Sequence, residues 1–83
     1  MSNKSATNLQ DAYLNYLRKE KIAATIYTIN GFQIKNAGIK GFDNFVIIIE
    51  ADNKQTMIYK HAVSSIAPSS AVNLSSLIQK DEQ

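Results

Sequence analysis

The chain has 83 residues and a formal net charge of +2, with no cysteine and a single histidine. These counts exclude a disulfide framework and argue against a structural zinc site, which needs several Cys or His ligands. An isolated domain of this length hides only about 60–65% of its unfolded surface, so we expect a thin core that oligomerisation stabilises.

Residues 1–7 are polar, and we expect them to form a flexible N-terminus. They lack the apolar segment of a signal peptide. No apolar run in the chain approaches the ~20 residues that a membrane span requires; the longest is Phe45–Ile49. The sequence therefore predicts a soluble, cytoplasmic protein with no membrane partner.

A helix follows this segment. Thr7 and Asn8 each have a capping-box partner three residues later, so the helix should begin there. Leucine and tyrosine then recur at helical spacing. The helix should end around residues 19–21, where cations suit the negative end of the helix dipole.

After the helix the apolar period changes to two, which is typical of strands. Asn30-Gly31 predicts a type I′ hairpin turn, Asn36–Gly38 predicts a bulge, and Gly41 should end the second strand. The unbroken apolar character of residues 45–51 favours burial on both faces. The predicted strands cover residues 24–29, 32–39, 45–51, 55–59 and 62–67.

These elements define a mainly β fold class, in which an N-terminal helix precedes a strongly bent, five-stranded antiparallel small barrel. The apolar strand Thr56–Tyr59 would be an aggregation hazard if it lay at an open edge. Pairing that edge with another copy of the chain can close a ring. The alternative is that this strand lies inside the sheet.

Assembly would also change the electrostatics of the protein. Residues 1–68 hold eight Lys or Arg and five Asp or Glu, and a ring would sum this excess into a field that attracts polyanions. Residues 69–83, rich in serine, should form a flexible C-terminal tail. Its apolar residues allow only a transient docking face: Val72, Leu74, Leu77 and Ile78.

The most informative motif is Tyr59-Lys60-His61. An aromatic ring, an ammonium and an imidazole can together contact a base, a phosphate and a ribose, although an exposed Lys-His pair in a turn is also an ordinary solvated feature. Together with Asn8–Asp11, Asn30–Phe32 and Gly41–Phe45, the motif resembles the Hfq family of bacterial Sm-like RNA chaperones. The resemblance covers residues 8–68 and implies an Sm-like, SH3-like barrel assembled as a homohexameric ring.

The resemblance implies that the helix-bearing face and the pore of the ring bind uridine-rich RNA. Lys60 would bond a uracil carbonyl, His61 would reach the ribose or phosphate, and Phe45 would stack on the base. Phe42 and Phe45 are three residues apart, so one should be core and the other exposed. Asp11 is alternatively a helix cap. The other residues assigned to this face are Gln10, Asp11, Phe42, Asn44 and Tyr59, with Tyr59 supporting the subunit contact.

The resemblance also implies an opposite face for adenine-rich RNA and a basic outer rim. The alternative for the opposite face is a routine hairpin with Tyr27 in the core, and Lys35 departs from the polar amide common in the family. The rim has one arginine, so its annealing activity should be weaker. Cations that the helix dipole favours at the end of a helix explain this basic cluster nearly as well. The opposite face comprises Tyr27, Asn30, Gly31, Phe32, Gln33, Ile34, Ser64 and Ser65; the rim comprises Arg18, Lys19 and Lys21.

An enzyme is not indicated. There is no cysteine nucleophile, second histidine or phosphate-cradling glycine loop, and the carboxylates show no acid–base or metal spacing. We expect no cofactor, metal or small-molecule substrate. The expected function is an RNA chaperone that binds U-rich 3′ ends of small regulatory RNAs and A-rich segments of mRNAs. It would promote their pairing in post-transcriptional regulation, such as a stress response. Alternatives are a general single-strand binder of OB or cold-shock type, and a structural ring or adaptor that binds no RNA.

Overall fold

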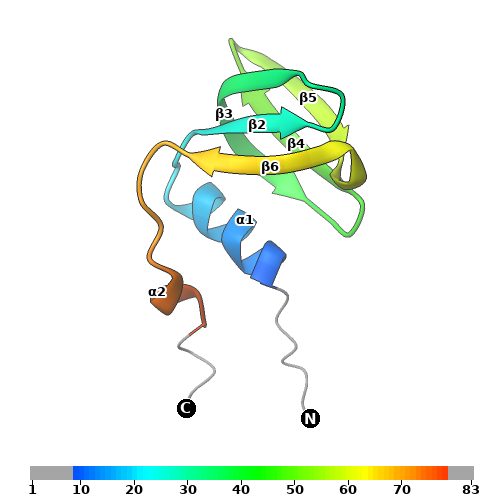
Figure 1. Cartoon of the computed structure of the whole chain (residues 1–83). Helices are drawn as coiled ribbons and strands as arrows, with labels where there is room; N and C mark the ends of the chain where they lie inside the picture. Colours follow the sequence, from blue (N-terminus) through cyan, green and yellow to red (C-terminus); the bar gives the residue numbers. More distant parts are fainter. Residues whose placement is uncertain (1–8, 79–83) are drawn as a thin grey trace.

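The computed structural model describes residues 9–78 and contains two helices, five strands and one short 3₁₀ turn (Figure 1). The predicted N-terminal helix and five antiparallel strands are confirmed. The predicted capping residues Thr7 and Asn8 lie outside the described residues. The elements are α1 (Leu9–Lys19), β2 (Ala24–Thr28), β3 (Gln33–Phe42), β4 (Val46–Ala51), β5 (Lys54–Tyr59), the 3₁₀ turn η1 (Lys60–Ala62), β6 (Val63–Pro68) and α2 (Leu74–Ile78).

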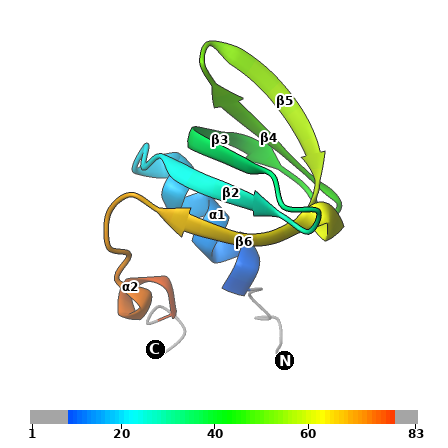
Figure 2. The same ribbon diagram turned by 45° about the horizontal axis from the view of Figure 1, so that its top comes forward.

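The five strands form one antiparallel sheet in the order β5-β4-β3-β2-β6. Figure 2 shows how strongly the sheet bends: the β4–β5 hairpin stands apart from β2 and β6, and α1 lies beneath the curved sheet. Strands β5 and β6 are the two ends of this order. The prediction that residues 56–59 lie at an edge is therefore confirmed, and the alternative position inside the sheet is wrong.

Two bulges in β3 produce the bend. Pairing with β2 shifts by one residue between Ala24 and Ile26, beside Asn36, whose φ is 58°. Pairing with β4 shifts between Ile39 and Gly41. The predicted bulge at residues 36–38 is confirmed, but the prediction that Gly41 ends the strand is wrong. A bulge changes the direction of a strand without ending its pairing, so β3 continues to Phe42.

The β2–β3 turn differs from the predicted type I′ turn. Among the central residues only Gly31 has a positive φ, 97°, whereas Asn30 does not. The Gly31 N–H donates to the Thr28 carbonyl at 3.1 Å and the Thr28 N–H donates to the Phe32 carbonyl at 2.9 Å, so the loop is one residue wider and carries a glycine bulge. The Thr28 hydroxyl accepts the Phe32 N–H at 3.0 Å and thereby favours this wider loop.

The type I′ conformation occurs instead between β4 and β5. Asp52 and Asn53 both have positive φ, 54° and 63°, and the flanking Ala51 and Lys54 are paired across the hairpin. Two residues in this conformation match the natural twist of the strands. The β4–β5 hairpin is therefore tight, and β5 forms one outer edge of the sheet.

The core is apolar and lies between α1 and the sheet. Leu14 and Leu17 of α1 are buried with Ile26, Ile47 and Ile49, and none of the described buried residues is polar or charged. Each such side chain contributes roughly 1.5–3 kcal/mol through burial. In strand β4, Ile47 and Ile49 are buried and the other four residues are half-buried, so the predicted burial on both faces is complete on one face and partial on the other in the single chain.

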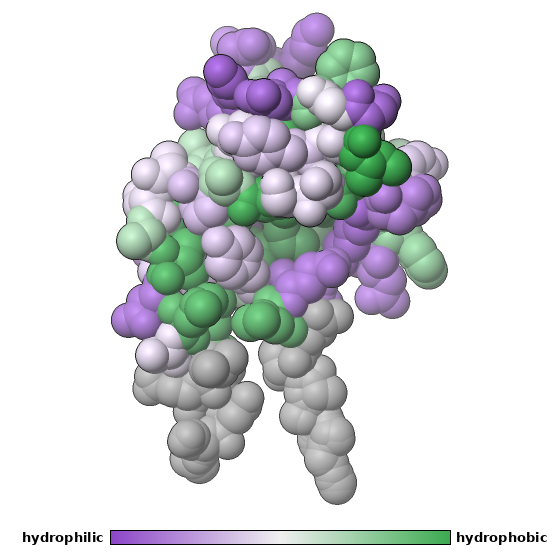
Figure 3. All heavy atoms as spheres, in the orientation of Figure 1, coloured by the Kyte–Doolittle hydropathy of each residue, from purple (hydrophilic) through white to green (hydrophobic). Residues whose placement is uncertain are grey.

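Residues 69–78 belong to the segment expected to be a flexible tail, and helix α2 within it was not predicted. The Asn73 side chain accepts the backbone N–H of Ser75 at 3.0 Å, which caps the helix start. Leu77 is 6% exposed, α2 contacts α1, and Val72 packs against the core. Hydrophobic residues gather near the helices in the space-filling view, whereas hydrophilic ones cover the opposite end (Figure 3). Residues 79–83 lie outside the described part.

Candidate nucleic-acid interface

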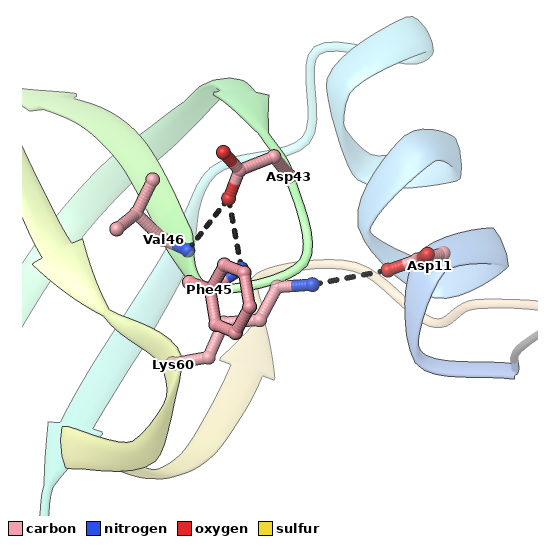
Figure 4. A network of polar contacts seen from close by, with 5 residues as sticks. All are labelled: Asp11, Asp43, Phe45, Val46 and Lys60. Atoms are coloured by element: carbon pink, nitrogen blue, oxygen red, sulfur yellow. Dashed lines mark hydrogen bonds and ion pairs between the residues drawn. The ribbon is translucent and has the colours of Figure 1, made fainter.

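Lys60 is the centre of the first candidate site, and its ammonium is held rather than free. It follows β5 as the first residue of η1, and its Nζ lies 3.1 Å from Asp11 Oδ1 of α1 (Figure 4). The same Nζ lies 5.4 Å from the centroid of the Phe42 ring. The Lys60 side chain is only 13% exposed. The alternative of an ordinary solvated lysine is therefore wrong, because an ion pair and a cation–π contact both restrain the ammonium.

Phe45 lies beside Lys60 on a rigid turn between β3 and β4. The backbone N–H groups of Phe45 and Val46 donate to Asp43 Oδ1 at 2.8 and 2.9 Å. These two hydrogen bonds lower the pKa of Asp43 below its usual 3.8; burial opposes the shift and the positive charge of Lys60 adds to it. The Lys60 N–H donates to the Phe45 carbonyl at 2.8 Å, so the turn is also tied to η1.

The two neighbouring phenylalanines have different environments, as predicted. Phe42 is half-buried and packs against the core, whereas Phe45 is 72% exposed. Asn44 is exposed in the same turn. An exposed aromatic ring on a restrained backbone can stack on a planar ligand without the cost of ordering the backbone of the turn.

The other residues of the Tyr-Lys-His motif form a separate aromatic pair. The Tyr59 and His61 rings are stacked with centroids 5.8 Å apart and an interplanar angle of 26°. Tyr59 is 52% exposed and His61 is also exposed. Because Tyr59 is paired with Val46 across β4 and β5, the stack stands at the end of the open β5 edge.

A cavity of about 260 Å³ lies between α1 and β6. Gln10 and Lys60 line it together with Ser64 and Ser65. The resemblance had implied opposite faces for these two pairs of residues. The pairing of β6 with β2 places Ser64 and Ser65 beside α1, so that both pairs line one cavity. Ser65 also pairs with Tyr27, which lies on the hairpin side.

The β2–β3 hairpin forms a second surface. Tyr27 pairs with Gln33 and with Ser65, and it is half-buried and outside the core cluster, so the alternative of a core tyrosine is wrong. Ile34 is half-buried, whereas Phe32 and Ile29 are each 68% exposed. Asn30 and Gly31 are exposed in the loop. Sequence reasoning missed Ile29, because a strand of alternating residues does not reveal that the loop begins there.

The rim residues occupy the end of α1. Arg18 and Lys21 line a second cavity, of about 390 Å³, with Lys40, while Lys19 lies nearby in the last turn of α1 without lining it. Lys21 has φ of 56°, and the chain turns there toward β2. Sequence reasoning missed Lys40 as a residue of this cavity. The Lys40 Nζ also lies 3.4 Å from Glu50 Oε1. Its position follows from the second bulge of β3, which has no clear signature in the sequence.

Two absences apply to the described part of the chain. Between residues 9 and 78, no three His, Cys, Asp or Glu side chains come together in a way that could hold a metal ion. Over the same residues, neither helix is long and apolar enough to cross a membrane.

An N-terminal helix, a strongly bent five-stranded barrel with two open edges, and aromatic and cationic side chains gathered at its turns define an Sm-like protein. Residues 9–73 match the model of a protein family described as "Hfq protein". The chain belongs to the Hfq family.

Curated relatives are similar over nearly their whole length. The RNA-binding protein Hfq of Desulforudis audaxviator (strain MP104C) is 58% identical over 72 residues, which cover 87% of this chain and 86% of the relative. That of Alkaliphilus oremlandii (strain OhILAs) is 53% identical over 77 residues, covering 93% and 95%. A 1.55 Å crystal structure of the pleiotropic translational regulator Hfq matches with a TM-score of 0.69 and 35% identity, covering 72% of this chain and 98% of that one.

Proposed function

We propose that this protein is an RNA chaperone that binds uridine-rich 3′ ends of small regulatory RNAs and adenine-rich segments of mRNAs, and that it promotes their pairing in post-transcriptional regulation in the cytoplasm. Its relatives carry the name RNA-binding protein. The observation that supports the proposal best is the exposed Phe45 ring on its Asp43 turn, beside the restrained ammonium of Lys60.

The uridine site is proposed to use stacking and hydrogen bonding together. A base stacks on Phe45, which contributes roughly 1–3 kcal/mol per base. Lys60 donates to a uracil carbonyl, and Gln10, which lines the same cavity as Lys60, hydrogen-bonds the base. His61 reaches the ribose or phosphate of the 3′ end. Asn44 extends the polar border of the site.

The adenine site is proposed to lie on the β2–β3 hairpin. Tyr27 and Phe32 offer ring faces, and the exposed backbone at Gly31 can approach a base edge closely because glycine has no side chain there. Gln33 and Ser65 flank Tyr27 on the two neighbouring strands and can hydrogen-bond a purine edge. The remaining contributors are proposed to be Asn30, Ile34 and Ser64.

Six copies are proposed to form a ring. Strands β5 and β6 end the sheet at opposite sides, so β5 of one copy can pair with β6 of the next. A head-to-tail contact of this kind forms a ring with no free edge when the rotation from one copy to the next closes after a whole number of copies, which is proposed to be six. The exposed Met57 and Tyr59 on β5 would be covered by such pairing.

The ring acts through proximity and charge, without a chemical step. Two RNA strands held on opposite faces of one scaffold have a high effective concentration for each other. Arg18, Lys19 and Lys21 on the rim reduce phosphate repulsion between the strands. With one arginine among them, the rim lacks most of the planar forks that bind phosphate in two places, so its contribution to annealing is modest.

The proposal is tested by solution mass and by two-ligand binding. Light scattering should give a mass of six chains. Labelled hexauridylate and an adenine-rich oligonucleotide should both bind, more weakly at higher salt, and saturation with one should leave the affinity for the other unchanged. A folded monomer that binds both RNAs competitively would indicate a general single-strand binder, and a ring without RNA affinity would indicate a structural protein or adaptor.

A further inference from the structure

The loop between β2 and β3 holds an asparagine whose side chain can react with the backbone of the next residue. Asn30 is followed by Gly31, and both residues are exposed. Among the described residues, every other asparagine is followed by a residue with a side chain, which hinders the approach of its backbone nitrogen. Asn30 is therefore the described asparagine that is sterically most open to attack by a neighbouring amide.

The loop also activates the Asn30 side chain. The Thr28 hydroxyl donates to Asn30 Oδ1 at 2.7 Å, which is shorter than its alternative contact of 3.3 Å to the Phe32 carbonyl. A donated hydrogen bond withdraws electron density from the amide carbonyl, so the carbonyl carbon becomes more electrophilic. A Cβ atom built at Gly31 would have no atom within 4 Å, which shows that the space beside the attacking residue is open.

One contact opposes the reaction. The Gly31 N–H donates to the Thr28 carbonyl at 3.1 Å, and this hydrogen bond must break before the nitrogen can attack. Exposed hydrogen bonds of a loop open locally at a much lower cost than those of the core. Asn15 and Asn36, in contrast, lie inside α1 and β3. The reaction at Asn30 therefore needs only local opening of the loop, with the rest of the fold intact.

We propose that Asn30 is a site of spontaneous deamidation. The backbone nitrogen of Gly31 loses its proton and attacks the side-chain carbonyl carbon of Asn30. A carbon–nitrogen bond forms, the side-chain nitrogen leaves as ammonia, and a succinimide ring results. Water then adds to either carbonyl of the ring and opens it, which gives aspartate or isoaspartate. No electrons are transferred, and water is the only co-reactant.

The modification would change the hairpin surface. Both products place a carboxylate on the exposed loop, where it repels RNA phosphates. Isoaspartate also lengthens the backbone by a carbon atom, which disturbs the hydrogen bonds between Thr28 and Phe32 on the two sides of the loop. Ageing of the protein therefore weakens the adenine site and spares the uridine site at Phe45. This consequence rests on the proposed function, whereas the modification itself does not.

Peptide mapping by mass spectrometry tests the modification. The folded protein is incubated for several days in mildly alkaline buffer and sampled over time. The peptide with Asn30 should gain the mass difference between a carboxyl and a carboxamide, and isoaspartyl methyltransferase should label it. Asn53 is an internal control, because it lies in an exposed turn but precedes Lys54. An unmodified Asn30, or equal reaction at Asn53, would overturn the proposal.

RNA binding by aged samples tests the consequence. Aged wild type should bind a labelled adenine-rich oligonucleotide roughly fivefold more weakly, the effect of one surface charge about 4 Å from a phosphate in water. Freshly prepared Asn30→Asp should show the same weakening. Asn30→Gln keeps a neutral amide that would have to form a larger ring, so its affinity should not change during the incubation, whatever its starting value. Hexauridylate affinity should stay constant in all samples.

The outcomes distinguish this proposal from the proposed function. If Asn30 is modified and the affinity for the adenine-rich oligonucleotide does not fall, the adenine site is wrong and the modification stands. If the oligonucleotide binds but Asn30 stays unmodified, only the deamidation is wrong. Equal loss of affinity by aged wild type and aged Asn30→Gln would show that the loss has another cause and would overturn the proposed consequence.

Discussion

Two exposed phenylalanines, one on each proposed RNA face, allow a matched test of the whole scheme. Phe45 is 72% exposed on the β3–β4 turn and Phe32 is 68% exposed on the β2–β3 hairpin. Because both rings lie largely in solvent, truncation to alanine removes little buried surface. We expect each variant to keep its free energy of unfolding within about 0.5 kcal/mol of wild type.

The binding effects should be large and separate. Loss of one base stacked on an aromatic ring costs roughly 1–3 kcal/mol, which corresponds to about a 5- to 150-fold rise in Kd. Phe45→Ala should weaken the binding of hexauridylate by this factor and leave the affinity for the adenine-rich oligonucleotide unchanged. Phe32→Ala should do the reverse, so each variant is the control for the other.

Fluorescence anisotropy with each labelled RNA, at one fixed salt concentration, measures both values. Chemical denaturation on the same samples checks that the fold is intact. If either variant weakened the binding of both RNAs equally, the assignment of the two faces would be refuted. Unchanged hexauridylate affinity in Phe45→Ala would refute stacking at the uridine site.

Three further predictions concern the turns and the edge. Asp43→Asn removes the carboxyl group whose pKa is lowered in the folded protein. Such a carboxylate stabilises the folded protein at pH values above its unfolded pKa of 3.8. This contribution to stability disappears as the pH falls through the folded-state pKa. Wild type should therefore be more stable than the variant at neutral pH and approach it in acid, whereas a constant offset across a pH series of thermal melts would contradict this. Gly31→Ala should lower the free energy of unfolding by about 1–2 kcal/mol, because φ is 97° there; an unchanged denaturation midpoint would show that the loop has another conformation. Met57→Lys places a charge on the open β5 edge, and light scattering should give a smaller mass with an unchanged circular dichroism spectrum; a mass equal to wild type would exclude this edge from the assembly.

Local sequence determined most of the secondary structure. The apolar period changes from helical to alternating near residue 21, and the observed α1 and β2 follow that change. The bulge near Asn36 was also predictable, since asparagine tolerates the left-handed conformation that the bulge requires. The spacing of Phe42 and Phe45, three residues apart, was enough to predict that one ring packs in the core and the other faces solvent.

Turn type and strand continuity were less predictable, because they depend on contacts beyond the local residues. The Thr28 hydroxyl bonds the Phe32 N–H and favours a wider loop than Asn30-Gly31 would form alone. Gly41 reads as a strand end, yet pairing with Ile48 of β4 carries the strand onward. Helix α2 depends on burial of Leu77, and a short helix in water is not stable without such tertiary packing.

The sequence by itself determined which chemical groups are available at the proposed RNA sites: aromatic rings at Phe42 and Phe45, one of them exposed, a cation at Lys60, and a hairpin turn at Asn30-Gly31. Only the tertiary structure decided how those groups are held. The 3.1 Å contact between Lys60 and Asp11 joins residues 49 positions apart, and no periodicity encodes it. Local patterns report which face of an element is apolar, but the position of a charged atom is set by the long-range packing that brings α1 beside η1.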